Sequence, residues 1–257
     1  MAELDGAPVG ADELQVLALT NYGHFTTMRV EDGRVRGLSL HLERLVRDCR
    51  ALFDAELDPE RVRAFARRAA PGRGAAIIRV TVFDPDLDLG HIGGEARPRV
   101  LVTTRPAGDL PLPPLRVGSV PFVREMAQVK NVGLFGTLRH RRVTQRAGLD
   151  DALFVDARSH VSEGGTWNIG FVRAGEVVWP DAECLAGTTM RLLKVVHPFT
   201  VASVPSSGVG EWEAAFATNA ATGVRAVAAI DGHPLAGSHP MLDLLRKEYL
   251  AVPADPL

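Results

Sequence analysis

The 257-residue sequence has few cysteines and no long apolar run. Its two cysteines, Cys49 and Cys184, are too few for a disulfide framework, so we expect free thiols and a cytoplasmic protein. No stretch approaches about 18 unbroken apolar residues, and the acidic start lacks the apolar core of a signal peptide. We therefore expect no membrane span. The formal net charge of −2 gives no reason to expect a nucleic-acid partner.

Several common chemical motifs are also missing. The sequence contains no G-x-G-x-x-G or G-x-x-x-x-G-K-[ST] nucleotide loop and no G-x-S-x-G nucleophile elbow. Its eight histidines are scattered without the spacing of metal ligands, so we expect no metal site. The basic stretch 139–146 is interpreted as the solvated face of a helix.

Lysine is almost absent. Of the 29 lysines and arginines only three are lysines, namely Lys130, Lys194 and Lys247. Arginine stays protonated and cannot act as an amine nucleophile, so chemistry that needs an amine has only these three candidates. For each lysine, an ordinary place on the surface remains the alternative.

The spacing of apolar residues predicts alternating strands and helices. Apolar and β-branched runs predict strands at 15–20 and 25–31, with a hairpin turn at Asp32-Gly33. Helical spacing predicts a helix at 40–55, and Asp58-Pro59 predicts the start of a second helix. Further strands are expected at 75–83, 99–103, 117–123, 152–156, 160–162, 169–172, 177–179 and 224–230, and further helices at 134–147, near 189, near 210 and at 240–250.

The stretch 105–116 carries four prolines and is the best linker candidate. We therefore predict a small N-terminal α/β domain at 1–104 and a larger C-terminal domain at 117–257 that carries Lys130. The strands follow one another too often for a regular βαβ series, so we expect mixed or antiparallel sheets in an α/β (α+β) fold.

Five segments follow one another in an order that is informative. The first is Tyr22–Val35 (YGHFTTMRVEDGRV), and the second is His41–Leu45 (HLERL). The third is Val129–Lys130, in a loop before a helix. The fourth is Val161–Val172 (VSEGGTWNIGFV). The fifth pairs the motif LAGTT at 185–189 with FATNAATGVRAV at 216–227.

Together these segments resemble class IV aminotransferases, the fold-type IV pyridoxal phosphate enzymes, over nearly the whole chain. This family includes branched-chain and D-amino acid aminotransferases and aminodeoxychorismate lyase. The resemblance implies the two-domain fold-type IV architecture and pyridoxal 5′-phosphate as cofactor. It also implies a small-molecule amino donor and acceptor as substrates and a homodimer.

The resemblance also assigns roles to residues. Lys130 matches the lysine that forms a Schiff base with the cofactor and moves the substrate proton, so it must act as a neutral amine. Glu163 matches the residue that contacts the pyridine nitrogen and keeps it protonated. The resemblance implies that three parts of the chain bind the cofactor phosphate. They are the guanidinium of Arg44, the helix start at Thr188 and Thr189, and a turn at Asn219 and Ala220.

The reaction stays open between transfer and elimination. Phe25-Thr26-Thr27 resembles the lyases, and Thr27 could assist elimination. The acidic start of the segment 83–97 would repel carboxylates, and this favours a transaminase. Phe25 and Arg79 are candidate substrate contacts, although Arg79 could also be a plain strand residue. A transaminase acting on a small amino acid or amine is our first interpretation. A 4-amino-4-deoxychorismate lyase, which eliminates pyruvate to give 4-aminobenzoate, is the second.

Three departures from the family pattern keep further alternatives open. The first segment is two residues short, Phe135 stands where the family often has a tyrosine, and Met190 stands where it usually has an arginine. These departures motivate a non-catalytic homologue that binds the cofactor. An unrelated α/β binding domain is the remaining alternative.

Overall fold

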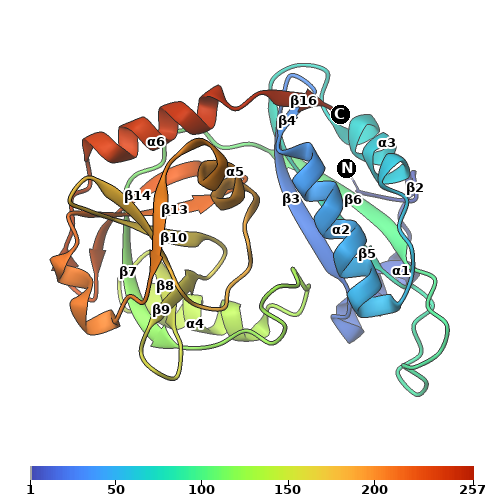
Figure 1. Ribbon diagram of the computed structural model, residues 1–257. Helices are drawn as coiled ribbons and strands as arrows, with labels where there is room; N and C mark the ends of the chain where they lie inside the picture. Colours follow the sequence, from blue (N-terminus) through green and yellow to red (C-terminus); the bar gives the residue numbers. More distant parts are fainter. Residues whose placement is uncertain (1) are drawn as a thin grey trace. The chain divides into compact units, whose positions relative to one another are not determined.

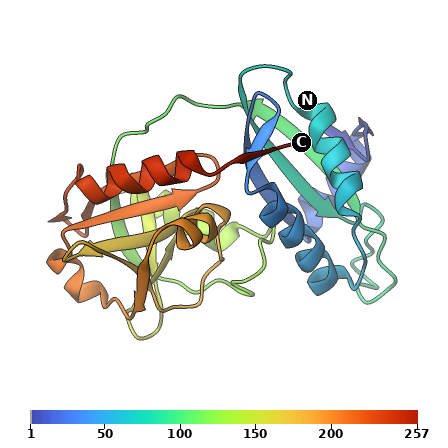
Figure 2. The same ribbon diagram turned by 45° about the horizontal axis from the view of Figure 1, so that its top comes forward.

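The computed structural model describes residues 2–257, which form two compact units (Figures 1 and 2). The first unit contains the chain up to Gly108, the short segment Val129–Gly133 and the last residues, Ala254–Leu257. The second unit contains Asp109–Gln128 and Leu134–Pro253. The chain therefore returns twice to the first unit.

The first unit is built on a seven-stranded sheet in the order β16-β4-β3-β5-β6-β1-β2. All its neighbouring strands are antiparallel. The strands are β1 (Ala2–Leu4), β2 (Ala7–Pro8), β3 (His24–Glu31), β4 (Arg34–Arg36), β5 (Ala75–Phe83), β6 (Arg99–Pro106) and β16 (Ala254–Pro256).

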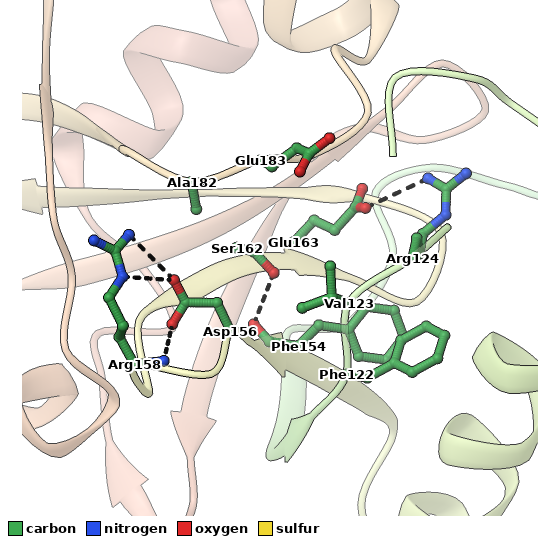
Figure 3. Close-up of a pocket in the computed structure, with 10 residues that line it drawn as sticks. All are labelled: Phe122, Val123, Arg124, Phe154, Asp156, Arg158, Ser162, Glu163, Ala182 and Glu183. Atoms are coloured by element: carbon green, nitrogen blue, oxygen red, sulfur yellow. Dashed lines mark hydrogen bonds and ion pairs between the residues drawn. The ribbon is translucent and has the colours of Figure 1, made fainter. Parts of the chain in front are cut away.

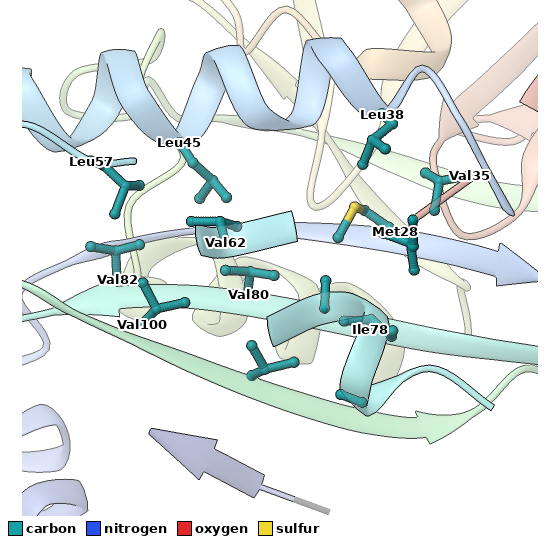
Figure 4. Close-up of a cluster of buried hydrophobic side chains, with 14 of the residues drawn as sticks. Met28, Val35, Leu38, Leu45, Leu57, Val62, Ile78, Val80, Val82 and Val100 are labelled. Atoms are coloured by element: carbon teal, nitrogen blue, oxygen red, sulfur yellow. The ribbon is translucent and has the colours of Figure 1, made fainter. Parts of the chain in front are cut away.

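Two helices, α2 (Leu38–Phe53) and α3 (Pro59–Ala69), cover one face of this sheet (Figure 4). Successive side chains of a strand point to opposite faces, and one face of β3, β5 and β6 carries the apolar residues. Met28, Ile78 and Val80 are among those that pack against Leu45 of α2 and Val62 of α3. The opposite face of the central strands carries both polar and apolar side chains, and the candidate substrate contacts Phe25 and Arg79 are among them.

One predicted strand of the first unit is wrong. Residues 15–20 belong to a helix, α1 (Ala11–Thr20), and not to a strand. The helix start is fixed locally, because the Glu13 carboxylate accepts a hydrogen bond from the Gly10 N–H at 2.7 Å. Apolar periodicity in a short run cannot by itself distinguish a strand from a helix.

The second unit is built on a nine-stranded sheet in the order β12-β11-β10-β13-β14-β7-β8-β9, with β15 paired to β14. The expected mixed character is confirmed, because β7 runs parallel to β14 and β8 while the pairs of β13 are antiparallel. The strands are β7 (Leu115–Pro121), β8 (Asp151–Val155), β9 (Val161–Gly164), β10 (Asn168–Arg173), β11 (Glu176–Pro180), β12 (Phe199–Ala202), β13 (Ala214–Asn219), β14 (Gly223–Ile230) and β15 (His233–Pro234).

The helices of the second unit are α4 (Phe135–Arg146), α5 (Thr188–Val196), the 3₁₀ helix η1 (Ser206–Glu211) and α6 (Pro240–Ala251). Helices α5 and α6 pack on the sheet through a cluster that contains Trp179, Phe216, Leu193 and Leu242. A separate cluster, with Leu153, Phe171 and Val227 among its members, fills the other side of the sheet.

Local turn and cap signals are well reproduced. The hairpin turn at Asp32-Gly33 has the two positive φ angles, 49° and 72°, of the turn that matches the strand twist. The predicted N-cap Asp58 accepts a hydrogen bond from the Glu60 N–H at 2.9 Å, and Pro59 opens α3. Within residues 2–257 no helix is long and apolar enough to cross a membrane.

Candidate functional site

The Lys130 segment lies at an open edge of the first unit's sheet. Strand β4 pairs with β3 only at Glu31 and Arg34, which leaves the start of β3 without a strand on that side. The Phe25 N–H donates to the Lys130 carbonyl at 2.9 Å, and the Val132 N–H donates to the Gly23 carbonyl at 2.9 Å. An antiparallel bridge joins His24 and Asn131 between them.

This placement corrects one expectation. The sequence predicted that the C-terminal domain carries Lys130, whereas the segment Val129–Gly133 belongs to the first unit. The reason is non-local pairing: an unpaired strand edge offers backbone donors and acceptors to any segment that reaches it. The rest of the chain between Asp109 and Pro253 does belong to the second unit.

A buried carboxylate holds the backbone of Lys130. Asp48 of α2 has no exposed surface, and its Oδ2 accepts a hydrogen bond from the Lys130 N–H at 2.9 Å. Its Oδ1 accepts from the Arg47 side chain at 2.9 and 2.6 Å. Sequence reasoning missed Asp48, because its partner is a backbone group far along the chain. Its position seven residues after His41, on the buried face of α2, was the available signal.

Arg44 lies one helical turn before Asp48 and is also buried, with 4% of its surface exposed. His41 occupies the same face and makes a hydrogen bond with the Thr26 hydroxyl, with 2.7 Å between Nδ1 and Oγ1. Burial lowers the pKa of His41 to about 3, and the nearby charges of Arg44 and Lys130 add to this effect. His41 is therefore neutral at pH 7. The positive charge near His41 is therefore carried by Arg44 and Lys130.

Phe25, Thr27 and Arg79 lie close together on the face of the same sheet that points away from α2 and α3. Thr27 of β3 is the direct cross-strand neighbour of Arg79 on β5. The Arg79 guanidinium carbon lies 3.6 Å from the centre of the Phe25 ring, and Lys130 Nζ lies 4.7 Å from that centre. The Phe25 ring thus contacts both cations. Burial lowers the pKa of Arg79, whose only hydrogen bond to a side chain among residues 2–257 is the one from Nε to Thr81 Oγ1 at 3.2 Å.

Glu163 of β9 lines a cavity of about 230 Å³ inside the second unit (Figure 3). Its Oε1 lies 3.4 Å from Nη1 of Arg124, and its Oε2 accepts a hydrogen bond from the Leu185 N–H at 3.3 Å. Only 6% of Glu163 is exposed. The Glu163 carboxylate is thus held from two sides, by the guanidinium of Arg124 and by the backbone of the loop before α5.

Asn168 fixes the loop that leads into α5. Its Nδ2 donates to the Leu185 carbonyl at 2.7 Å, and its Oδ1 accepts from the Gly187 N–H at 3.1 Å. A Cβ at Gly187 would lie 2.1 Å from that oxygen, so only glycine fits there. The sequence pattern contained Asn168, but it gave no role to this residue.

Thr188 and Thr189 open helix α5 with buried hydroxyls. Each side chain is at most 2% exposed, and neither Oγ1 has a hydrogen-bond partner in the described part of the chain. The N-cap residue is Gly187, so no side chain caps the first N–H groups of the helix. A helix start with free N–H groups and free hydroxyls suits an anion.

In the turn at Asn219 and Ala220, the Asn219 side chain already occupies two backbone N–H groups. Asn219 Oδ1 accepts hydrogen bonds from the Ala221 N–H, the Thr222 N–H and the Thr222 hydroxyl, at 2.9 to 3.0 Å. The Asn219 side chain therefore stabilises the turn itself. The neighbouring Thr218 is 1% exposed, and its hydroxyl has no partner among residues 2–257. It lies directly opposite Asn168 in the sheet, and sequence reasoning missed it.

The structure thus groups the predicted residues in two sets. Lys130, Arg44, Phe25, Thr27 and Arg79 belong to the first unit, and Glu163, Thr188, Thr189, Asn219 and Ala220 belong to the second.

Two of the three departures from the family pattern, Met190 and Phe135, have different surroundings. Met190 is buried in the core under α5, so packing explains an apolar residue at its position. Phe135, at the start of α4, is 82% exposed within the second unit. Residues 2–257 contain no cluster of three or more side chains suited to a metal ion.

Comparison with known proteins identifies the family. The model of the family described as amino-transferase class IV matches residues 23–230, which is well over half of the chain. The chain therefore belongs to the class IV aminotransferase family.

Solved structures show the same fold. A branched-chain aminotransferase from Thermoproteus uzoniensis, determined with norvaline, is 22% identical, covers 97% of this chain and 93% of its own, and superposes with a TM-score of 0.83. A hypothetical aminotransferase from Mycobacterium tuberculosis in its PLP-bound form is 19% identical, with 98% of both chains covered and a TM-score of 0.81. A fold IV-transaminase from Curtobacterium pusillum is 22% identical, with coverage of 92% and 86% and a TM-score of 0.78. The predicted fold-type IV architecture is confirmed.

Proposed function

We propose that this chain is a pyridoxal 5′-phosphate-dependent class IV transaminase that acts on a small amino acid or amine through Lys130. The observation that carries the proposal is the start of α5, where two buried hydroxyls have no hydrogen-bond partner among residues 2–257 and no side chain caps the helix. A phosphate group satisfies such a site. The buried carboxylate of Glu163 fits the other end of the cofactor, because it can accept a hydrogen bond from a protonated ring nitrogen.

The residues have distinct tasks under this proposal. Arg44, Thr188 and Thr189 bind the phosphate, Glu163 keeps a proton on the ring nitrogen, and the Asn219–Ala220 turn adds backbone N–H groups. When bound, pyridoxal phosphate supplies an electron-withdrawing ring that stabilises negative charge on the substrate carbon. Lys130 Nζ, once free, moves a proton at that carbon.

The substrate carboxylate is assigned to Arg79. This guanidinium is partly buried, stacks on Phe25 and has no carboxylate partner among the described residues. A half-buried cation without an anion favours an anionic ligand. Thr27 adds a hydroxyl beside it on the neighbouring strand.

The first experiment tests the cofactor and the lysine together. Purified protein is incubated with pyridoxal 5′-phosphate, reduced with borohydride and analysed by peptide mass mapping. We expect the cofactor mass on Lys130 in the wild type and in the control Lys247→Ala, and none in Lys130→Ala. Trapping in Lys130→Ala at the wild-type level would contradict the lysine assignment.

The second experiment separates transfer from elimination. Amino-group exchange with a panel of amino acids and pyruvate release from 4-amino-4-deoxychorismate are measured side by side. Exchange without pyruvate supports the transaminase, and pyruvate without exchange supports the lyase that the Phe25-Thr26-Thr27 sequence suggested. Cofactor binding with neither activity would support the non-catalytic homologue.

We also propose that the chain forms a homodimer that works on small-molecule amino donors and acceptors. The support is its membership of the class IV aminotransferase family. Light scattering of the cofactor-loaded protein is expected to give twice the mass of one chain. A fully active monomer would contradict this proposal.

A further inference from the structure

A cluster of buried polar side chains lies between β3 and α2, next to the Lys130 segment. Its members are almost completely inaccessible, and they are His24, Thr26, His41, Arg44 and Asp48. Both histidines are neutral at pH 7, because burial lowers the pKa of each to about 3. Asp48 is therefore the one anion in this buried cluster, while Arg44 is a cation within it. The cluster also lies close to the positive charges of Arg47 and Lys130.

Both oxygens of Asp48 are used. Oδ2 accepts the Lys130 N–H at 2.9 Å, and Oδ1 accepts two N–H groups of Arg47, the closer at 2.6 Å. A charged acceptor forms a stronger bond to a backbone N–H than a neutral one does. Asp48 belongs to the buried face of α2, so the helix backbone sets the point from which its side chain extends.

Helix geometry connects this bond to Arg44. Residues four apart on a helix lie on the same face one turn apart, so Arg44 and Asp48 are neighbours on the buried side of α2. One rigid element thus presents a guanidinium and, one turn later, the acceptor that holds the Lys130 backbone. Displacing that acceptor would move the root of the lysine side chain relative to Arg44.

We propose that Asp48 is a positioning residue for Lys130. Its carboxylate holds the Lys130 backbone at the edge of β3. Because Asp48 and Arg44 belong to the same helix, this bond also fixes where the Lys130 side chain begins relative to Arg44. This inference rests on the proposed function, in which Lys130 reacts with the cofactor and Arg44 binds its phosphate. Under this proposal Asp48 contacts neither the cofactor ring nor its phosphate, and it acts through Lys130.

The test compares Asp48→Ala with Asp48→Asn. Alanine removes both acceptors, whereas asparagine loses the charge and keeps one oxygen, which can still accept from the Lys130 N–H. Asp58→Ala is the matched control, because it removes the N-cap bond of α3 in the same unit and affects stability alone. For each protein we measure the rate of borohydride trapping at Lys130, the pH midpoint of the cofactor's visible absorption, the affinity of the apoprotein for inorganic phosphate, and thermal unfolding.

In Asp48→Ala we expect trapping to slow by about tenfold, because the Lys130 N–H loses a charged acceptor. We expect the absorption midpoint to shift, the phosphate affinity to stay within about twofold, and Asp48→Asn to recover most of the trapping rate. Asp58→Ala should leave trapping and the midpoint unchanged.

The proposal is overturned if folded Asp48→Ala traps at the wild-type rate with an unchanged midpoint. It is also overturned if Asp48→Asn is as slow as Asp48→Ala, or if Asp58→Ala slows trapping to the same extent. If Asp48→Ala does not fold, Asp48→Asn decides: trapping measurably below the wild-type rate supports the proposal, and wild-type trapping with a wild-type midpoint overturns it. Failure of the proposed function looks different, because the wild type itself would then not trap the cofactor on Lys130.

Discussion

Two adjacent threonines at the start of α5 carry buried hydroxyls without a hydrogen-bond partner among residues 2–257. A buried hydroxyl without a hydrogen bond costs roughly 1–3 kcal/mol, so a protein keeps such groups where a ligand completes them. Under the proposed function, Thr188 and Thr189 would reduce the stability of the protein without cofactor and would strengthen its binding of the cofactor phosphate.

Replacing both threonines with valine tests this directly. Thr188→Val with Thr189→Val keeps the shape and removes the hydroxyls, so the free energy of unfolding of the apoprotein should rise by about 1 kcal/mol. Affinity for pyridoxal 5′-phosphate should fall by about tenfold, while affinity for pyridoxal, which lacks the phosphate, should not change. Calorimetry with both ligands measures this. An equal loss of affinity for both ligands would show that the threonines do not bind the phosphate.

Single residues also show which parts of the site were predictable. Glu163, Thr188 and Thr189 were predicted as site residues because they stand in short contiguous patterns. Thr218 stands in such a pattern but was given no role, and Asp48 was not predicted, because its partner is a backbone group from a distant loop. A one-dimensional pattern contains no signal for such a contact.

At the scale of elements, the loop before α5 is the link between Glu163 and the helix start. The Leu185 N–H bonds to Glu163, and the Leu185 carbonyl and the Gly187 N–H bond to Asn168. A single loop residue therefore ties β9 to β10. The position of the first turn of α5 follows from these bonds.

Asn168→Ala should loosen this loop. The Leu185 carbonyl and the Gly187 N–H lose their partners, so we expect the free energy of unfolding to fall by about 2 kcal/mol. Hydrogen exchange should quicken in the first turn of α5, and the affinity for pyridoxal 5′-phosphate should fall more than that for pyridoxal. Thr144→Val on α4, which removes the bond from its hydroxyl to the His140 carbonyl, is the control in the same unit. Equal exchange rates in α5 of both variants would argue against this role.

Elements with strong local signals were predicted well. The helix expected at 40–55 is found at Leu38–Phe53, and the last helix begins at Pro240 as expected. The error at residues 15–20 arose where the apolar run was short and only the bond from Gly10 to Glu13 decided for a helix. The strands β1, β2 and β16 were not predicted, because each is only two or three residues long and depends on pairing with a partner strand.

At the scale of the whole molecule, buried histidines link stability to pH. Burial lowers the pKa of His24 and of His41 to about 3, from about 6.5 in an unfolded chain. Between these values the unfolded chain binds protons that the folded protein does not. The two histidines therefore leave stability intact above about pH 6.5 and reduce it as the pH falls toward 3, each by about 1.4 kcal/mol per pH unit.

His24→Phe should remove part of this dependence. Neither ring nitrogen of His24 has a hydrogen-bond partner among residues 2–257, and the ring lies against Phe53, so an aromatic apolar side chain suits the site. Between pH 7 and pH 5 the variant should lose about 2 kcal/mol less stability than the wild type. Urea unfolding at several pH values measures both slopes. Parallel curves for the two proteins would mean that His24 does not contribute to the acid sensitivity.

The sequence by itself determined the family, the fold-type IV architecture and most of the helices, because local periodicity, turn residues and contiguous motifs carry that information. It also singled out Lys130 from a chain with three lysines. Only the tertiary structure decided that the Lys130 segment completes the sheet of the first unit, that Asp48 holds its backbone and that Asn168 fixes the start of α5. Each of these depends on hydrogen bonds between residues far apart in the sequence, and folding alone brings such groups together.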